Sequence, residues 1–357
     1  MMNNDSIELT SADFDRAMMQ RAITLALKGV GHVAPNPLVG CVITHDGVVI
    51  GEGYHAKFGD AHAEVNAIAS VQNPEMLKES TLYVTLEPCA HYGKTPPCAD
   101  LIVKFGIPRV VIGAMDPFPL VNGRGAQRLR EAGVEVEENI EHEACREMNR
   151  RFFCFQEKKR PYVILKWAQT SDGFMDVVRN CGEKGVRWIS GPETKLLVHQ
   201  WRSEESAVLV GRNTVINDNP LLTVREVSGT SPLRIVLTQD AQLPEGSAVL
   251  DQLAPTLILN NHLSNKIGDT EWLQCADVHD LSEVLQTLHA RNIQSVFVEG
   301  GAKVLHSFID SGLWDEARVI TGSPTFEDGL AAPVLKGRLT ETMTRGSDVI
   351  HFYRNQG

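Results

Sequence analysis

Three short segments in the N-terminal half carry residue types that bind metal ions and move protons. They are His62-Ala63-Glu64, Pro88-Cys89 and Cys98. An imidazole and two thiolates are a good ligand set for Zn²⁺, and they leave the fourth tetrahedral position to a water molecule whose pKa the metal lowers. Glu64, two residues after the histidine, can reach that water and pass its proton to a departing amine. The pattern predicts a catalytic zinc site in which Glu64 acts as acid and base.

The spacing of these residues resembles a known signature with one change. Zinc deaminases combine H-x-E with P-C-x-x-C, whereas eight residues separate Cys89 from Cys98 in this chain. Two other interpretations are that the three residues are unrelated, or that His91 completes a structural zinc site with four protein ligands. We favour a catalytic zinc because a strand predicted over residues 81–86 leads into Cys89, and helices are predicted to start at both halves of the motif.

The elements that must position these residues alternate along the N-terminal half. Asp46-Gly47 separates two short apolar runs, which predicts a β-hairpin. Thr10 or Ser11 can cap a first helix, and another helix is expected to begin near His62. The predicted strands are residues 38–44, 48–54, 81–86 and 110–114, and the later helices are residues 98–105, 124–132 and 141–153. This alternation indicates an α/β layered fold.

A charged segment that ends in Pro161 follows the last of these helices. We place a domain boundary in it, which gives domains of residues 1–157 and 158–357. The second half alternates again, with strands predicted over residues 162–167, 207–211, 235–238, 256–259 and 296–299, and helices predicted around His199 and over residues 281–291 and 302–310. It is therefore expected to form a second α/β domain.

The composition limits the partners and the compartment. The chain has 357 residues, of which 43% are hydrophobic and 22% are charged, as in a globular protein. The 34 Lys and Arg against 45 Asp and Glu give a net charge of −11, which argues against binding to nucleic acid or to an anionic membrane. No apolar stretch is long enough to span a membrane, and the polar N-terminus does not resemble a signal peptide. Seven dispersed cysteines favour the reducing cytoplasm over a disulfide framework.

Two glycines in the second half lie where a strand is predicted to end and a helix to begin. Glycines in such a turn let backbone N–H groups approach a phosphate at the helix N-terminus. Gly300-Gly301 has this placement, and the segment from Val210 to Thr214 has a similar one. Neither is a G-x-G-x-x-G motif, so each could equally be a tight turn without a ligand.

With these motifs in place, the chain resembles the bacterial bifunctional riboflavin-biosynthesis deaminase–reductases. The long loop before Cys98, which contains Lys94-Thr95-Pro96-Pro97, distinguishes that family from cytidine and tRNA-adenosine deaminases. The resemblance covers nearly the whole chain. It is carried by Ala34-Pro35-Asn36-Pro37, by the segment from Thr85 to Cys98, by Leu165-Lys166-Trp167-Ala168, by the segment from Asp218 to Arg225, and by Val298-Glu299-Gly300-Gly301.

The resemblance implies two consecutive reactions on a small molecule. The N-terminal domain, cytidine-deaminase-like with three α/β/α layers, would deaminate 2,5-diamino-6-ribosylamino-4(3H)-pyrimidinone 5′-phosphate with Zn²⁺. The C-terminal domain, dihydrofolate-reductase-like and α/β, would then use NADPH to reduce the ribosyl group, giving 5-amino-6-ribitylaminouracil 5′-phosphate. A homo-oligomer is also expected.

The resemblance also assigns residues to each site. His62, Cys89 and Cys98 would hold zinc, with Glu64 as the catalytic residue. The pyrimidine and its phosphate would contact Asn36, His55, Lys94 and Asp116. NADPH would contact Thr214, Asp218, Gly300 and Gly301, and the reductase substrate would contact Lys166, Leu222, Arg225 and Glu299. Lys94 and Arg225 suit a phosphate by charge, whereas Asn36 and Asp116 each precede a proline and could instead be turn residues.

Two segments depart from the family pattern. Phe118 stands where relatives usually have asparagine, and residues 177–187 form a longer, charged loop with Val186 in place of a serine. We interpret Arg179 and Lys184 in that loop as solvated. Three alternatives stay open: an active deaminase with an inactive reductase domain, a nucleic-acid base deaminase with an appended nucleotide-binding domain, and a non-catalytic binding protein with a structural zinc.

Overall fold

The computed structural model describes residues 10–90, 96–118, 121–179 and 183–356. The chain divides into two compact units, Met1–Lys158 and Lys159–Gly357, which are described separately below. Within the described ranges, no helix has both the length and the apolar character needed to cross a bilayer.

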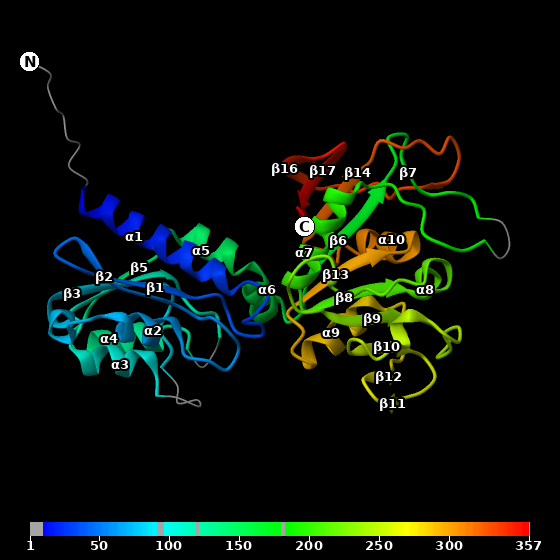
Figure 1. Ribbon diagram of the computed structural model, residues 1–357. Helices are drawn as coiled ribbons and strands as arrows, with labels where there is room; N and C mark the ends of the chain where they lie inside the picture. Colours follow the sequence, from blue (N-terminus) through cyan, green and yellow to red (C-terminus); the bar gives the residue numbers. More distant parts are fainter. Residues whose placement is uncertain (1–9, 91–95, 119–120, 180–182, 357) are drawn as a thin grey trace, which may run out of the picture. The chain divides into compact units, whose positions relative to one another are not determined.

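The first unit is built on a five-stranded mixed sheet with the order β2-β1-β3-β4-β5 (Figure 1). β1 and β2 form the predicted hairpin, and β1 also runs antiparallel to β3, whereas β3, β4 and β5 are parallel. Asp46 and Gly47 both have positive φ, 48° and 73°, as a two-residue hairpin turn of type I′ requires. The strands are β1 Gly40–His45, β2 Val48–Tyr54, β3 Ser80–Leu86, β4 Arg109–Ala114 and β5 Glu135–Glu138.

Helices cover both faces of this sheet. Ala67, Ile102 and Leu129 bring α2, α3 and α4 into one buried cluster, while Met19 and Cys145 bring α1 and α5 into a cluster on the other face. Figure 1 shows the same two groups on opposite sides of the sheet. The predicted three-layer α/β/α fold is therefore confirmed. The helices are α1 Ser11–Ala26, α2 Ala63–Ser70, α3 Cys98–Phe105, α4 Arg124–Glu131, α5 His142–Met148 and α6 Arg150–Lys158, with short 3₁₀ turns η1 Leu27–Gly29 and η2 Pro74–Glu79.

The helix predicted over residues 141–153 is in fact two helices, because Asn149 interrupts it. Asn149 is buried, and its φ and ψ of −98° and 19° lie outside the helical range. Its side-chain oxygen accepts from the Leu38 N–H, and its amide donates to the Leu38 carbonyl, both at 2.8 Å. Asn149 therefore pairs like a strand residue with the loop that carries Asn36.

The second unit is a ten-stranded sheet with the order β11-β12-β10-β9-β8-β13-β6-β14-β17-β16. The strands from β12 to β14 in this order are parallel, and β11, β17 and β16 are antiparallel to their neighbours. The strands are β6 Tyr162–Gln169, β8 Ala207–Gly211, β9 Leu233–Leu237, β10 Thr256–Asn260, β11 Asn265–Ile267, β12 Thr270–Gln274, β13 Ser295–Gly300, β14 Glu316–Thr321, β16 Arg338–Arg345 and β17 Asp348–Arg354, with a separate pair β7 Phe174–Asp176 and β15 Leu330–Ala331.

The two faces of this sheet differ in polarity because side chains alternate along each strand. Leu165 and Val298 face a core that includes Leu285 of α9 and Phe308 of α10. The alternate positions of β6, β13 and β14 include Lys166, Glu299 and Arg318. α7 lies over this second face, because Trp201 packs edge-on against Phe297 at 6.2 Å. The helices are α7 Pro192–Glu204, α8 Arg212–Asp218, α9 Leu281–Ala290 and α10 Ala302–Asp310, with a 3₁₀ turn η3 Ala248–Leu250.

We predict that Gly53→Ala destabilises the first unit. A Cβ at Gly53 would collide with the backbone of Ala63 and Ala67, so α2 would be pushed off β2. Overpacking of this kind costs about 1–3 kcal/mol, and urea unfolding followed by circular dichroism would measure it. Gly191→Ala is the control, because φ there is −76° and the added Cβ would meet only Asp348, at 3.7 Å. Equal stability of both variants would contradict the close packing of α2 on β2.

Candidate functional site

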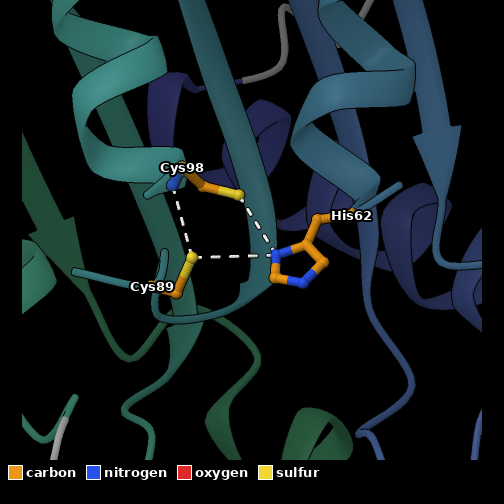
Figure 2. Close-up of side chains that lie close together, drawn as sticks. All are labelled: His62, Cys89 and Cys98. Carbon is orange, nitrogen blue, oxygen red and sulfur yellow. Dashed lines mark hydrogen bonds between the residues drawn. The ribbon is translucent and has the colours of Figure 1, made fainter. Parts of the chain in front are cut away.

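The three predicted zinc ligands converge at the ends of three elements (Figure 2). His62 precedes α2, Cys89 follows β3, and Cys98 is the first residue of α3. His62 Nδ1 lies 3.3 Å from Cys98 Sγ and 3.7 Å from Cys89 Sγ, and the three ligand atoms all lie within 4.8 Å of one another. Ligands at 2.0 and 2.3 Å from a tetrahedral zinc are about 3.5 Å apart. The donor set therefore fits Zn²⁺ in chemistry and in spacing.

The protein environment favours a thiolate at this site. The Cys98 thiol beside Cys89 lowers the pKa of Cys89, although burial opposes this, and the Cys98 N–H also donates to the Cys89 sulfur at 3.3 Å. A lowered thiol pKa prepares the sulfur for a cation. Among the described residues, these three form the candidate metal set. His91 and Lys94 lie outside the described residues, so the possible fourth ligand and the phosphate contact stay predictions.

Glu64 lies in the first turn of α2 with only 3% of its surface exposed. Burial raises its pKa to about 7, the nearby Cys89 adds to the effect, and the carboxyl group is hydrogen-bonded to the Cys98 side chain. A carboxyl group whose pKa is close to neutral can both accept and return a proton. The geometry therefore places an acid–base group directly beside the metal ligands.

Two further predicted residues form a hydrogen-bonded pair near the metal ligands. Burial lowers the pKa of His55, which keeps the ring neutral, and its Nδ1 donates to the Ala61 carbonyl at 3.1 Å. Its Nε2 must then accept from the Asn36 amide, 3.0 Å away. One of the two N–H groups of the Asn36 amide is thereby committed to His55. The His55 ring also packs edge-on against the ring of His62, at 5.7 Å.

The structure shows the turn contact of Asp116, whereas its contact with the substrate stays a prediction. Its Oδ1 accepts from the Phe118 N–H at 2.8 Å, which is the turn contact. The side chain is nevertheless buried, and burial raises its pKa to about 6. Phe118 takes part in this turn through its backbone, so its unusual side chain does not prevent the turn.

In the second unit, Lys166 and Glu299 lie side by side on neighbouring strands. Lys166 Nζ is 3.5 Å from Glu299 Oε2, and Arg202 of α7 holds the same carboxylate with both Nε and Nη2. Burial alone would raise the pKa of Glu299, but Arg202 and Lys166 lower it to about 2. Sequence reasoning missed Arg202, because a helical arginine gives no sign that it points at a buried carboxylate 97 residues later.

α7 also holds the segment that contains Leu222 and Arg225. Arg202 Nη1 donates to the Thr223 carbonyl at 3.3 Å, and His199 Nδ1 accepts from the Arg225 N–H at 3.3 Å. Leu222 is buried and adopts a positive φ of 56°. The side chain of Arg225 is 40% exposed, and its Nε lies 3.8 Å from Glu226 Oε1. The predicted substrate residues are thus gathered around α7.

Three of the predicted cofactor residues meet at the glycine turn. A Cβ at Gly300 or Gly301 would lie 3.1 or 3.3 Å from Thr214 Oγ1, and Gly301 has a φ of 75°. The turn ends β13 and leads into α10. Because the two glycines lack side chains, the Thr214 side chain packs directly against the turn. Asp218 lies one turn beyond Thr214, at the end of α8.

The interpretation of Arg179 as solvated is wrong. Its side chain is only 12% exposed and binds Asp176 at 2.6 Å and Asp218 at 2.8 Å. It also donates to the Gly185 carbonyl at 2.9 Å, and the Gly185 N–H donates to the Asn217 carbonyl at 2.7 Å. The described part of the divergent loop is therefore attached to α8. Lys184 is exposed, as expected.

The fold and the metal site define a class of protein, a zinc-binding deaminase unit joined to a second α/β unit, and comparisons identify the family. Residues 12–114 match the family model for the cytidine and deoxycytidylate deaminase zinc-binding region, and residues 161–350 match the RibD C-terminal domain. The chain therefore belongs to the RibD family of riboflavin biosynthesis proteins.

Individual relatives agree over nearly the full length. Riboflavin biosynthesis protein RibD of Aquifex aeolicus is 38% identical, with 96% of this chain and 99% of the relative covered. RibD of Actinobacillus pleuropneumoniae is 40% identical over 85% of this chain and 82% of the relative. The crystal structure of a diaminohydroxyphosphoribosylaminopyrimidine deaminase/5-amino-6-(5-phosphoribosylamino)uracil reductase from Thermotoga maritima is 35% identical, with a TM-score of 0.88 and with 97% of this chain and 100% of that chain covered.

We predict that the purified protein binds about one zinc ion per chain, and that Cys98→Ala loses most of it because one of three protein ligands is removed. Elemental analysis after gel filtration would measure the zinc. Cys145→Ala is the matched control, since Cys145 is also buried but is not in the metal set. Wild-type zinc content in Cys98→Ala would exclude Cys98 as a ligand.

Proposed function

We propose that this chain is a bifunctional enzyme of riboflavin biosynthesis. Residues 1–157 would be the zinc-dependent pyrimidine deaminase domain, and residues 158–357 the NADPH-dependent reductase domain. The observation that carries the proposal is the convergence of His62, Cys89 and Cys98 beside the buried carboxyl group of Glu64. The second activity and the substrate, a phosphorylated diaminopyrimidine, are proposed from the name of the similar Thermotoga maritima deaminase/reductase.

In the first reaction, Glu64 would move the proton. When bound, zinc lowers the pKa of water enough to supply hydroxide near neutral pH. His62, Cys89 and Cys98 would hold the zinc, and Glu64 would accept a proton from the attacking water and return it to the departing amine, a role that its pKa of about 7 supports. Asn36 would contact the pyrimidine through its amide, whose orientation is fixed by the hydrogen bond to His55. Asp116 and Lys94 would contact the rest of the substrate.

In the second reaction, NADPH would supply the hydride, and the protein would position both partners. Thr214, Asp218 and the Gly300–Gly301 turn would hold the cofactor. Leu222 and Arg225 would hold the substrate, with the Arg225 guanidinium facing its phosphate. Lys166 and Glu299 would bind the ribosyl part, and Arg202 keeps Glu299 ionised. A carboxylate acceptor beside an ammonium donor suits sugar hydroxyl groups.

The same proposal covers the setting of the enzyme. We place it in the cytoplasm, because thiolate ligands and free cysteines need reducing conditions. The net charge of −11 and the 6% of aromatic residues favour a small-molecule substrate over nucleic acid. A homo-oligomer stays a prediction that multi-angle light scattering would check.

We predict that the purified enzyme releases ammonia from the diaminopyrimidine phosphate and then oxidises NADPH. Glu64→Gln should retain zinc but lose ammonia release by about 10²–10⁴-fold, the usual contribution of general acid–base catalysis. A coupled assay of ammonia and NADPH would measure both steps. The same variant should still oxidise NADPH when given the deaminated intermediate. Unimpaired ammonia release would remove Glu64 from the mechanism, and a wild type inert toward the intermediate would favour the inactive-reductase alternative.

A second prediction concerns the divergent loop. Arg179→Gln should weaken NADPH binding about three- to tenfold. The carboxylates of Asp176 and Asp218 would then repel the polyanionic cofactor, because no cation beside them offsets their charge. Fluorescence titration of NADPH would measure the dissociation constant. Arg179→Gln combined with Asp176→Asn restores the charge balance and should recover most of the affinity. A double variant as weak as the single one would show that charge compensation is not the cause.

A further inference from the structure

Glu87 is a buried carboxylate that none of the assigned roles uses. It follows β3, directly before Pro88 and the metal ligand Cys89, and only 4% of its surface is exposed. In the described part of the chain, no lysine, arginine or histidine forms an ion pair with it, and its hydrogen-bond partners are backbone N–H groups. An ionised carboxylate in such a place needs several hydrogen-bond donors to offset its desolvation.

Four backbone N–H groups supply those hydrogen bonds. Oε2 accepts from Asp116 at 3.3 Å and from Gly123 at 2.9 Å, while Oε1 accepts from Gly125 at 2.8 Å and from Ala126 at 3.1 Å. Gly125 and Ala126 lie in the first turn of α4, where the helix dipole also favours a negative charge. One side chain therefore ties the end of β3 to the segment after β4 and to the start of α4.

Three backbone contacts hold the same region from other sides. A Cβ on Gly125 would collide with the Pro88 carbonyl oxygen, so α4 packs directly against the turn that carries Cys89. The Glu87 N–H donates to the Ala114 carbonyl at 2.9 Å, and the Ala99 N–H donates to the Cys89 carbonyl at 3.2 Å. The Pro88-Cys89 turn is thus held by packing against α4 and by backbone hydrogen bonds to β4 and α3.

We propose that Glu87 is the positioning residue of the metal centre. It fixes Cys89 in its ligand position, and it also holds the backbone of Asp116. The inference rests on the proposed deaminase function. A carboxylate has enough lone pairs for all four N–H groups, whereas an amide of the same shape has one acceptor oxygen and an NH₂ group that would face two donors. The charge of Glu87, and not only its shape, is therefore required.

The test is Glu87→Gln, measured first as zinc affinity by competition with a chelator. Loss of a group that supports a metal ligand costs about 10–100-fold in metal affinity or activity, so we expect both zinc affinity and the kcat of ammonia release to fall by about tenfold or more. Glu283→Gln is the matched control. Glu283 also accepts two backbone N–H groups, from Ala276 and Asp277, but it lies in the second unit.

NADPH oxidation with the deaminated intermediate serves as the internal control and should be unchanged in Glu87→Gln. Wild-type zinc affinity and kcat in this variant would overturn the proposal, and so would a lower melting temperature with both values unchanged. If the wild type neither binds zinc nor releases ammonia, the proposed function fails instead.

A measurement on the wild type keeps the test valid if Glu87→Gln does not fold. If Glu87 couples Cys89 to α4, zinc binding must protect the amides that Glu87 holds, because coupling between sites is reciprocal. We expect hydrogen exchange at Gly123, Gly125 and Ala126 to slow on zinc loading, with no change at Ala276 and Asp277. Equal exchange rates with and without zinc would overturn the proposal.

Discussion

The first unit depends on one geometric constraint, the meeting of an imidazole and two thiols within 4.8 Å of one another. The three residues come from positions 62, 89 and 98, and each lies at an end of a helix or strand. The ends of regular elements are the places where a rigid scaffold can fix a side chain without bending a strand or a helix. The position of β3 in the sheet therefore matters for the chemistry, because the end of β3 must place Cys89 close to the first residues of α2 and α3.

Buried glutamates show how the same side chain is given different properties by its surroundings. Glu64 is desolvated beside thiols, and its pKa rises to about 7. Glu299 is equally buried, but Arg202 and Lys166 lower its pKa to about 2. Glu87 is held by four backbone N–H groups. The first environment suits proton transfer, the second suits a fixed negative acceptor, and the third suits a structural anchor.

The departures from the family pattern are accommodated by local contacts. Phe118 contributes a backbone N–H to Asp116, and any residue except proline could do the same. The described part of the charged loop after β7 is attached to α8 through Arg179. A solved structure that has a TM-score of 0.88 at 35% identity shows that this fold tolerates extensive substitution.

The sequence by itself indicated the metal ligand set, the place of Glu64, the β-hairpin at Asp46-Gly47 and most of the central strands, because these depend on residue type, short spacing and apolar runs. It missed the buried strand β14, and it missed β5, β16 and β17; β5 and β16 are rich in charged residues and leave no apolar run to recognise. Only the tertiary structure decided that Asn149 divides a helix, that Arg202 faces Glu299, that Arg179 pairs with Asp176 and Asp218, and that Glu87 holds α4. Each of these contacts joins residues that are distant in the chain or separated by a loop, and hydrogen-bond partners of that kind have no local signature.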